Sequence, residues 1–162
     1  MGTRTVEVDY YLYPGLIFAQ KEMCMVTTVL GSCVSVCLWD PVYNTGGINH
    51  YMLPLWNGEG LPSPKYGNIA IRKLIEKMMA LGCRKENLKA KVFGGGAVLQ
   101  TSGGLLNVGE RNIILAEDIL AEEKIPIISR DVGGSQGRKL IFCTGSGTVL
   151  VKKILSRVEN SK

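Results

Sequence analysis

The chain has 162 residues, of which 46% are hydrophobic and 20% are charged, and its formal net charge is +5 at pH 7. This balance excludes a disordered tail and fits one ordinary hydrophobic core, so we expect a single domain over residues 1–162. Every apolar run is broken well before the roughly 20 residues that a membrane span requires. We therefore expect no membrane insertion.

The amino-terminal segment and the cysteines both bear on cellular location. Residues 1–10 carry Arg4, Glu7 and Asp9 and lack the apolar centre of a secretory signal, which predicts a cytoplasmic protein. The five cysteines should then be free thiols, because disulfides are rare in a reducing compartment. There is no CxxC pair and only one histidine, so we predict no metal site and no cofactor.

The positive charge is spread along the chain without an aromatic and basic cluster, which argues against nucleic-acid binding. It suits docking onto an acidic protein surface, where charge speeds the encounter. Two glycine-rich segments, 94–96 and 131–134, match no nucleotide-binding pattern. We interpret them as tight turns or close backbone approaches around a site.

The first third of the chain has the pattern of β-strands. β-Branched and aromatic residues at period two predict strands over 6–13, 23–30, 34–40 and 48–53. The Gly- and Pro-rich segment 55–67 predicts a loop at the rim of a binding site. Apolar residues at helical spacing from Ala70 to Leu81 then predict an amphipathic helix that Gly82 ends.

The rest of the chain adds one more helix and further strands. A buried strand over 88–93 runs into the first glycine segment, and Asn107 to Glu110 resembles a capping box that opens a helix reaching about Glu123. Strands over 125–129, 140–144 and 149–154 follow. Two main helices against a mixed, largely antiparallel sheet predict an α/β (α+β) layered sandwich.

Cys33 is the strongest candidate nucleophile. It follows a Gly-Ser turn at the end of a strand, where a thiol is approachable and the backbone N–H groups of Ser32 and Cys33 can stabilise an oxyanion. The alternative is that Cys33 is a small buried hydrophobe, as free cysteines usually are. We interpret the other cysteines as packing residues: Cys24, Cys37, Cys83 and Cys143.

His50 is the only histidine and the candidate base. A thiol with a pKa of about 8.5 is mostly protonated at neutral pH and needs a neighbouring imidazole to become a ready nucleophile. If strands 34–40 and 47–53 pair antiparallel about a centre between Pro41 and Val42, Cys33 and His50 stand face to face. A centre nearer Tyr43 offsets them, and His50 is then open to a second interpretation, a surface or satisfied core histidine.

Several separated motifs follow one another in a set order along the chain. They are Leu30-Gly-Ser-Cys33-Val-x-Val with Asp40-Pro41, Gly46-Gly-Ile-Asn-His50-Tyr-Met-Leu-Pro54, Lys65-Tyr66, Phe93-Gly-Gly-Gly-Ala97, Asn107-Val-Gly-x-Arg-Asn112, Asp131-x-Gly-Gly134 and Gly137-Arg138. In this order they resemble the chemoreceptor glutamine deamidase CheD family, over nearly the whole chain.

The resemblance implies catalytic roles for Cys33 and His50, with Thr27 orienting the imidazole and Thr28 as the alternative hydroxyl. It implies hydrolysis of selected glutamine side chains to glutamate, with release of ammonia, on the cytoplasmic helical region of methyl-accepting chemotaxis receptors. The implied mechanism is acyl transfer through a thioester without a cofactor. The family fold is a compact α/β sandwich, and family members also bind a CheC-type chemotaxis phosphatase.

Two other functions are compatible with the same residues. A transglutaminase-like enzyme or another cysteine amidohydrolase would use the same dyad with a different acceptor or protein substrate. A non-catalytic adaptor of a chemotaxis phosphatase would leave Cys33 inert. Transfer to a primary amine distinguishes the first, and thiol reactivity at neutral pH distinguishes the second.

Overall fold

The computed structural model describes residues 8–97 and 107–154 of the chain. Its elements, in chain order, are β1 (Val8–Tyr11), β2 (Ile17–Gln20), β3 (Cys24–Leu30), β4 (Val34–Asp40), β5 (Thr45–Asn49), α1 (Gly67–Ala80), a 3₁₀ turn (Lys85–Asn87), β6 (Lys89–Gly94), α2 (Val108–Glu122), β7 (Ile127–Val132), β8 (Gly137–Cys143) and β9 (Val149–Ile154).

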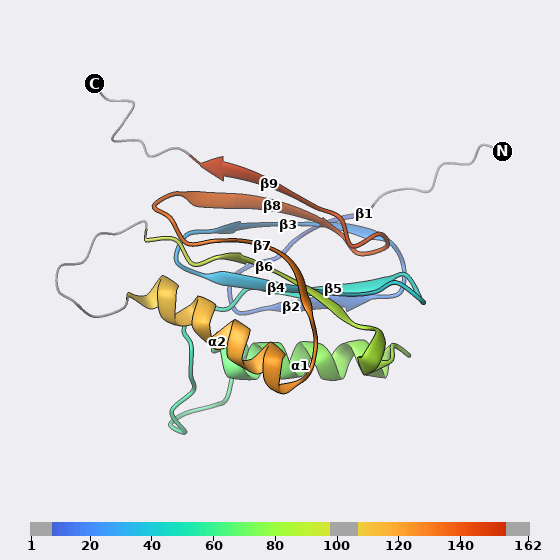
Figure 1. Cartoon of the computed structure of the whole chain (residues 1–162), viewed down its shortest axis with the longest axis horizontal. Helices are drawn as coiled ribbons and strands as arrows, with labels where there is room; N and C mark the ends of the chain where they lie inside the picture. The colour runs from blue at the N-terminus through green and yellow to red at the C-terminus, as the bar shows by residue number, and fades with distance from the viewer. Residues whose placement is uncertain (1–7, 98–106, 155–162) are drawn as a thin grey trace.

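These elements form three layers (Figure 1). An outer sheet has the strand order β1-β3-β8-β9, and a middle sheet has the order β2-β5-β4-β6-β7. The helices α1 and α2 cover the face of the middle sheet that is turned away from the outer sheet. The predicted α+β layered sandwich is confirmed, although its strands form two sheets where the sequence suggested one.

Both sheets are mixed and largely antiparallel, as predicted. The pairs β1–β3 and β6–β7 are parallel. The pairs β2–β5, β3–β8, β4–β5, β4–β6 and β8–β9 are antiparallel. The chain passes between the sheets at the turn from β3 to β4, which is where Cys33 lies.

Strand β4 is buried on both faces because the middle sheet is covered on both sides. Val34, Val36 and Leu38 pack in the core beneath the helices. Cys37 packs in the second core, between the two sheets, and Cys33 lies at its margin. Residues 33, 35 and 37 therefore face the outer sheet, since side chains alternate along a strand.

The structure adds one strand and shifts another relative to the sequence prediction. Strand β2, at the edge of the middle sheet, is only four residues long and was not predicted. Strand β5 begins at Thr45 and includes Gly46 and Gly47, whereas the prediction placed it over 48–53. A Cβ at Gly46 would lie 2.6 Å from the carbonyl oxygen of Thr144, so close approach of the other sheet requires glycine there.

Both predicted helices are present: α2 has the predicted bounds to within one residue, whereas α1 begins at Gly67, three residues before the predicted start. The predicted capping box is present at the start of α2, where the Glu110 N–H donates to Asn107 Oδ1 at 2.8 Å and the Asn107 N–H donates to Glu110 Oε1 at 3.1 Å. This pair satisfies two of the free N–H groups of the first turn. In the ranges that the structure describes, no helix is both long and apolar enough to cross a membrane.

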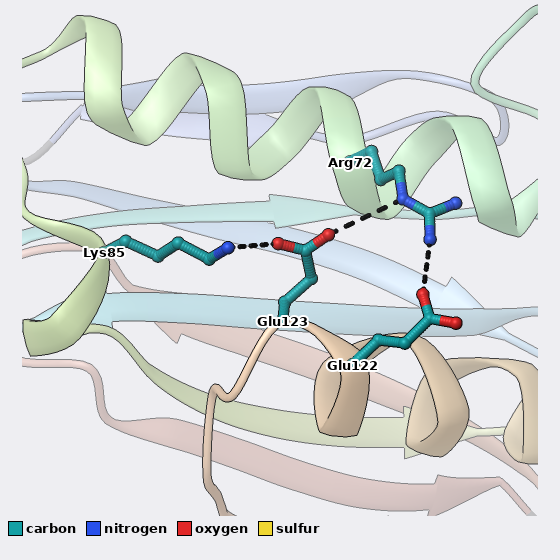
Figure 2. A network of polar contacts seen from close by, with 4 residues as sticks. All are labelled: Arg72, Lys85, Glu122 and Glu123. Atoms are coloured by element: carbon teal, nitrogen blue, oxygen red, sulfur yellow. Dashed lines mark hydrogen bonds and ion pairs between the residues drawn. The ribbon is translucent and has the colours of Figure 1, made fainter.

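An ion-pair network on the surface joins the C-terminal end of α2 to the middle of α1 and to the 3₁₀ turn (Figure 2). Glu123 accepts a short hydrogen bond from Lys85 and lies 3.6 Å from Arg72 Nε, and Arg72 Nη2 lies 2.7 Å from Glu122. The hydrogen bond from Lys85 is the main reason that the pKa of Glu123 is lowered. Such exposed pairs contribute about 1 kcal/mol or less each, so the network aligns the helices more than it stabilises them.

Candidate functional site

The candidate site lies at one end of the space between the two sheets. Residues 31–33, which we call the cysteine loop, connect β3 of the outer sheet to β4 of the middle sheet. Cys33 is partly exposed, and Gly31 and Ser32 are also partly accessible. A thiol in this position can be reached from solvent while its neighbours are held by both sheets.

The pairing of β4 with β5 decides how His50 is placed relative to Cys33. Leu38 pairs with Gly47 and Cys37 with Ile48, and an additional antiparallel bridge joins Val34 to Tyr51. In this register Met52 stands opposite Cys33, and His50 is the diagonal neighbour of Cys33 on the same face of the sheet. Diagonal pairs have Cα atoms about 7–8 Å apart, within reach of long side chains.

The hairpin of β4 and β5 is therefore centred between Val42 and Tyr43. This is one residue further along the chain than the centre between Pro41 and Val42 that would have placed Cys33 directly opposite His50. The offset is even, so both side chains still face the outer sheet. A shift by one further residue would have turned His50 towards the helices. The sequence left the register of β4 and β5 open, and the four-residue turn after Asp40 decides it. The Asp40 carboxylate stabilises this turn by accepting from the Val42 N–H at 2.8 Å.

His50 is buried, with 2% of its surface exposed, and one ring nitrogen is held by a threonine. Thr28 Oγ1 lies 2.7 Å from His50 Nδ1 and donates its hydrogen to the Leu12 carbonyl oxygen at 2.8 Å. A carbonyl can only accept, so the single hydroxyl hydrogen goes to Leu12 and His50 Nδ1 must carry the hydrogen that Thr28 accepts. The tautomer is thereby set, and Nε2 is an unprotonated acceptor.

Thr28, and not the predicted Thr27, is the residue that contacts the imidazole. Side chains alternate along β3, so Val26, Thr28 and Leu30 point into the space between the sheets. Thr27 points to the opposite, outer face of the sheet, where it lines a surface hollow with Met25 and Val29. The structure thus brings the alternative hydroxyl, that of Thr28, to the imidazole and places Thr27 on the opposite face of the strand.

Burial keeps both candidate catalytic groups neutral. Desolvation lowers the pKa of His50 to about 4 and raises the pKa of the Cys33 thiol above its ordinary value. Among the described residues, His50 Nε2 has no hydrogen-bond partner, so the thiol and the ring are not hydrogen-bonded in this state. The geometry supports a general base that takes the thiol proton during reaction, and it does not support a resting thiolate–imidazolium pair.

The first glycine segment approaches the cysteine loop, and the second is hydrogen-bonded to the first, the Gly133 N–H donating to the Gly94 carbonyl oxygen. Gly94 has φ +106°, and a Cβ there would run into the Cys33 carbonyl oxygen. Gly95 and Gly133 also have positive φ, which marks tight turns. Both segments are thus turns around the site.

Two polar residues around the site were not predicted to act there. Arg138 is buried, and its Nε donates to Asp131 Oδ1 at 3.0 Å. Asn112 is buried on α2 and hydrogen-bonds to Ser32 and Met52. Both lie in the sequence motifs named above, but only the tertiary contacts reveal what they touch.

The remaining cysteines are consistent with packing. Cys24, Cys37 and Cys83 are buried, and Cys143 is partly exposed on the outer sheet. Burial raises the pKa of Cys37 far above its ordinary value and that of Cys83 to about 11. Within residues 8–97 and 107–154, no group of three or more His, Cys, Asp and Glu side chains is arranged to hold a metal ion.

A partly exposed thiol, a neutral buried imidazole on the same sheet face and a hydroxyl in contact with that imidazole are groups of the kinds that a cysteine hydrolase uses. Comparison with known proteins then gives the family. Residues 52–153 match the family model described as CheD chemotactic sensory transduction. The chain belongs to the CheD family.

Individual relatives extend the match to the amino-terminal part of the site. The chain is 54% identical over 142 residues, 88% of each chain, to a "Probable chemoreceptor glutamine deamidase CheD" of Trichlorobacter lovleyi. It is 47% identical over 146 residues to the protein of the same name from Sulfurimonas denitrificans, covering 89% of this chain and 93% of the relative. Alignments that cover so much of the chain include the segment from Cys33 to His50, which lies before the family-model match.

The neutral dyad makes a prediction for thiol reactivity. We expect the alkylation rate of Cys33 to rise steadily with pH, without a plateau near neutral pH, because the thiol stays protonated up to a raised pKa. Iodoacetamide labelling followed by peptide mass spectrometry would measure this in a Cys143→Ser variant, which removes the other partly exposed cysteine. A plateau beginning at about pH 6 would instead indicate a resting ion pair and contradict the neutral dyad.

Proposed function

We propose that this protein is a protein-glutamine deamidase that hydrolyses glutamine side chains of chemoreceptors to glutamate and releases ammonia. Cys33 is the nucleophile, His50 the general base, and Thr28 the residue that orients His50. One observation carries the proposal: Thr28 holds His50 Nδ1 at 2.7 Å, which leaves Nε2 as a free base on the sheet face that carries Cys33. The relatives named as probable chemoreceptor glutamine deamidases support the choice of substrate.

The reaction is an acyl transfer in two halves. His50 Nε2 takes the Cys33 proton while the sulfur attacks the carboxamide carbon, and the protonated ring then gives its proton to the departing ammonia. Water attacks the resulting thioester and loses a proton to Nε2. The bond between sulfur and the acyl carbon then breaks, the departing sulfur takes the proton back from Nε2 to regenerate the Cys33 thiol, and the new carboxylic acid ionises to glutamate. The N–H groups of Ser32 and Cys33 stabilise the oxyanion in both halves.

Burial makes the ring a weak base with a pKa of about 4, and its hydroxyl partner carries no charge that would offset this desolvation. A carboxylate partner would stabilise the imidazolium by a full charge, but the path from His50 through Thr28 to the Leu12 carbonyl supplies only dipoles. The ring therefore stays neutral until the pH falls to about 4. The base is available over the whole neutral range, and its charge develops only during proton transfer.

The surroundings of the dyad suit a protein substrate. Tyr13, Leu16, Met52 and Leu53 are exposed apolar residues, with 38–62% of their surfaces accessible. The segment that carries Tyr13 and Leu16 is tied to the site by a hydrogen bond from the Gly15 N–H to the His50 carbonyl oxygen at 2.8 Å. We propose this apolar rim as the docking surface for the helical cytoplasmic region of a chemoreceptor, which places the activity in the cytoplasm.

The same rim is proposed to receive a CheC-type chemotaxis phosphatase, the partner implied by the family resemblance. A helical partner that covers Met52 would also cover Cys33, because the two residues are opposite each other in the sheet register. Phosphatase binding and receptor deamidation would then exclude each other. With this shared surface the protein would act as an enzyme when it binds a receptor and as an adaptor when it binds the phosphatase.

The two neighbouring threonines provide a matched pair of variants. Thr28→Val keeps the side-chain shape but removes the hydroxyl that orients His50, and we expect deamidation to fall about tenfold, the equivalent of one hydrogen bond. Thr27→Val, on the outer face of the same strand, should stay within about twofold of wild type. Timed deamidation of a receptor fragment measures both. Greater loss in Thr27→Val would return the orienting role to Thr27.

The dyad predicts non-additive losses. Cys33→Ala should abolish conversion of glutamine to glutamate, and His50→Ala should reduce it by about 10²–10⁴-fold, the usual contribution of a positioned base. The double variant should be no worse than Cys33→Ala, because groups that act as a unit are not additive. Mass spectrometry of a receptor fragment reads the product, after thermal unfolding has shown that each variant is folded. Near-normal turnover in either single variant would exclude the pair.

Competition tests the shared surface. Adding a CheC-type phosphatase should slow deamidation of the receptor fragment in proportion to its occupancy. Met52→Glu, which adds a charge to the rim beside Cys33, should weaken both phosphatase binding and receptor turnover. Simultaneous binding without any change in rate would refute the shared surface and leave the dyad unaffected.

A further inference from the structure

The backbone of the cysteine loop is held from outside at every carbonyl. The Gly96 N–H donates to the Gly31 oxygen at 2.9 Å, and the Gly95 N–H donates to the Cys33 oxygen at 2.8 Å. The carbonyl between them, that of Ser32, accepts from the side chain of Asn112 at 3.1 Å. Within the described part of the chain, the N–H groups of Ser32 and Cys33 donate to no other group. All three carbonyl oxygens of the loop thus accept a hydrogen bond, and the N–H groups of Ser32 and Cys33 are available to donate to a ligand.

Asn112 uses both hydrogens of its amide on this site. One goes to the Ser32 oxygen and the other to the Met52 oxygen, each at 3.1 Å. Ser32 precedes Cys33, and Met52 is opposite Cys33 and two residues after His50. One fully buried side chain therefore joins the two segments that carry the dyad.

Packing alone does not account for an asparagine at this position. Its Oδ1 is buried and has no hydrogen-bond partner among the described residues. A buried acceptor without a partner is destabilising, a loss that an apolar side chain of similar size would avoid. The benefit of the amide must lie in the two hydrogen bonds that it donates.

The bond to Ser32 sets the direction of the neighbouring N–H group. The Ser32–Cys33 peptide is trans, so the Ser32 C=O and the Cys33 N–H point in opposite directions. Asn112 lies on α2, in the helical layer beneath the middle sheet, so the Ser32 oxygen points to that layer. The Cys33 N–H then points to the other side, towards the face that carries the thiol and His50. An oxyanion formed by attack of Cys33 develops on that side.

Asn112 is itself held rigidly. Its backbone oxygen accepts the Tyr51 hydroxyl at 2.6 Å, and the capping box at Asn107 fixes the first turn of its helix. Gly109 on the same turn packs so closely on Gly95 that a Cβ at Gly109 would lie 2.5 Å from the Gly95 oxygen. The helix start, the glycine segment and the cysteine loop therefore form one close-packed unit.

We infer that Asn112 is a positioning residue for the oxyanion-binding amide of Cys33, an assignment that rests on the proposed deamidation. It acts through the orientation of a peptide group and touches neither the thiol nor the imidazole. Its removal should impair stabilisation of the tetrahedral intermediate and leave the reactivity of the thiol unchanged. This separates it from a residue that only supports the fold.

The test compares two reactions of Cys33 in the same variant. For Asn112→Ala we expect kcat for receptor-fragment deamidation to fall by about 10²-fold, the usual effect of losing one oxyanion donor, with KM little changed. The pH profile of Cys33 alkylation should match wild type, because alkylation forms no oxyanion. In Asn112→Asp, a protonated carboxyl can donate one of the two hydrogen bonds, so its kcat should recover partly at lower pH. This second variant keeps the test decisive if Asn112→Ala does not fold.

Thr144→Val is the matched control for loss of a buried hydrogen bond. Thr144 Oγ1 accepts from the Cys24 N–H at 2.9 Å, at the opposite end of β3 from the cysteine loop. This variant should lower the unfolding temperature but keep kcat near wild type. Normal kcat in a folded Asn112→Ala variant, or parallel loss of kcat and Cys33 alkylation, would overturn the assignment. Absence of turnover in the wild type would overturn the proposed function, and the assignment with it.

Discussion

The hydrogen bond between Thr28 and His50 is the contact on which the candidate site depends, because it joins the two sheets on the face that also carries Cys33. Thr28 belongs to the outer sheet, and His50 follows β5 of the middle sheet. The bond sets the ring tautomer only if the sheets pack at the observed spacing. Gly46 of β5 allows this close approach, because a Cβ there would run into Thr144 and Phe142 of the neighbouring layer, so the core between the sheets also sets the geometry of the candidate site.

A dyad buried without a charged partner has a particular chemistry. Desolvation lowers the pKa of the base and raises that of the thiol, so neither group is charged before substrate arrives. Charge then develops during the reaction, where preorganised backbone dipoles stabilise it most effectively. A resting thiol of this kind is protected from indiscriminate alkylation and oxidation, since the thiolate is the reactive form. Low reactivity of the resting thiol suits an enzyme that acts on only a few specific side chains of another protein.

The cysteine loop shows how backbone geometry is controlled by distant parts of the chain. Its carbonyls are satisfied by the glycine segment after β6 and by a side chain on α2. The glycine segment is in turn held by β7, where the Gly133 N–H donates to the Gly94 oxygen at 2.9 Å and Arg138 binds both Asp131 and the Gly133 oxygen. These residues correspond to the separated motifs of the sequence. The fold brings these motifs into contact although they are far apart in the sequence.

The sequence alone was sufficient to predict the layered class, both helices, the capping box at Asn107 and the choice of Cys33 and His50 as candidates. These features depend on local periodicity, on cap and turn chemistry, and on the presence of a single histidine. Four others needed the tertiary structure. The division into two sheets and the strand β2 depend on long-range pairing, which a four-residue edge segment does not encode locally. The choice between Thr27 and Thr28 depends on which face of β3 is covered, and the role of Asn112 depends on contacts with residues 60 and 80 positions away. Alternation along a strand separates two faces, and only the packing of the sheets decides which face is inside.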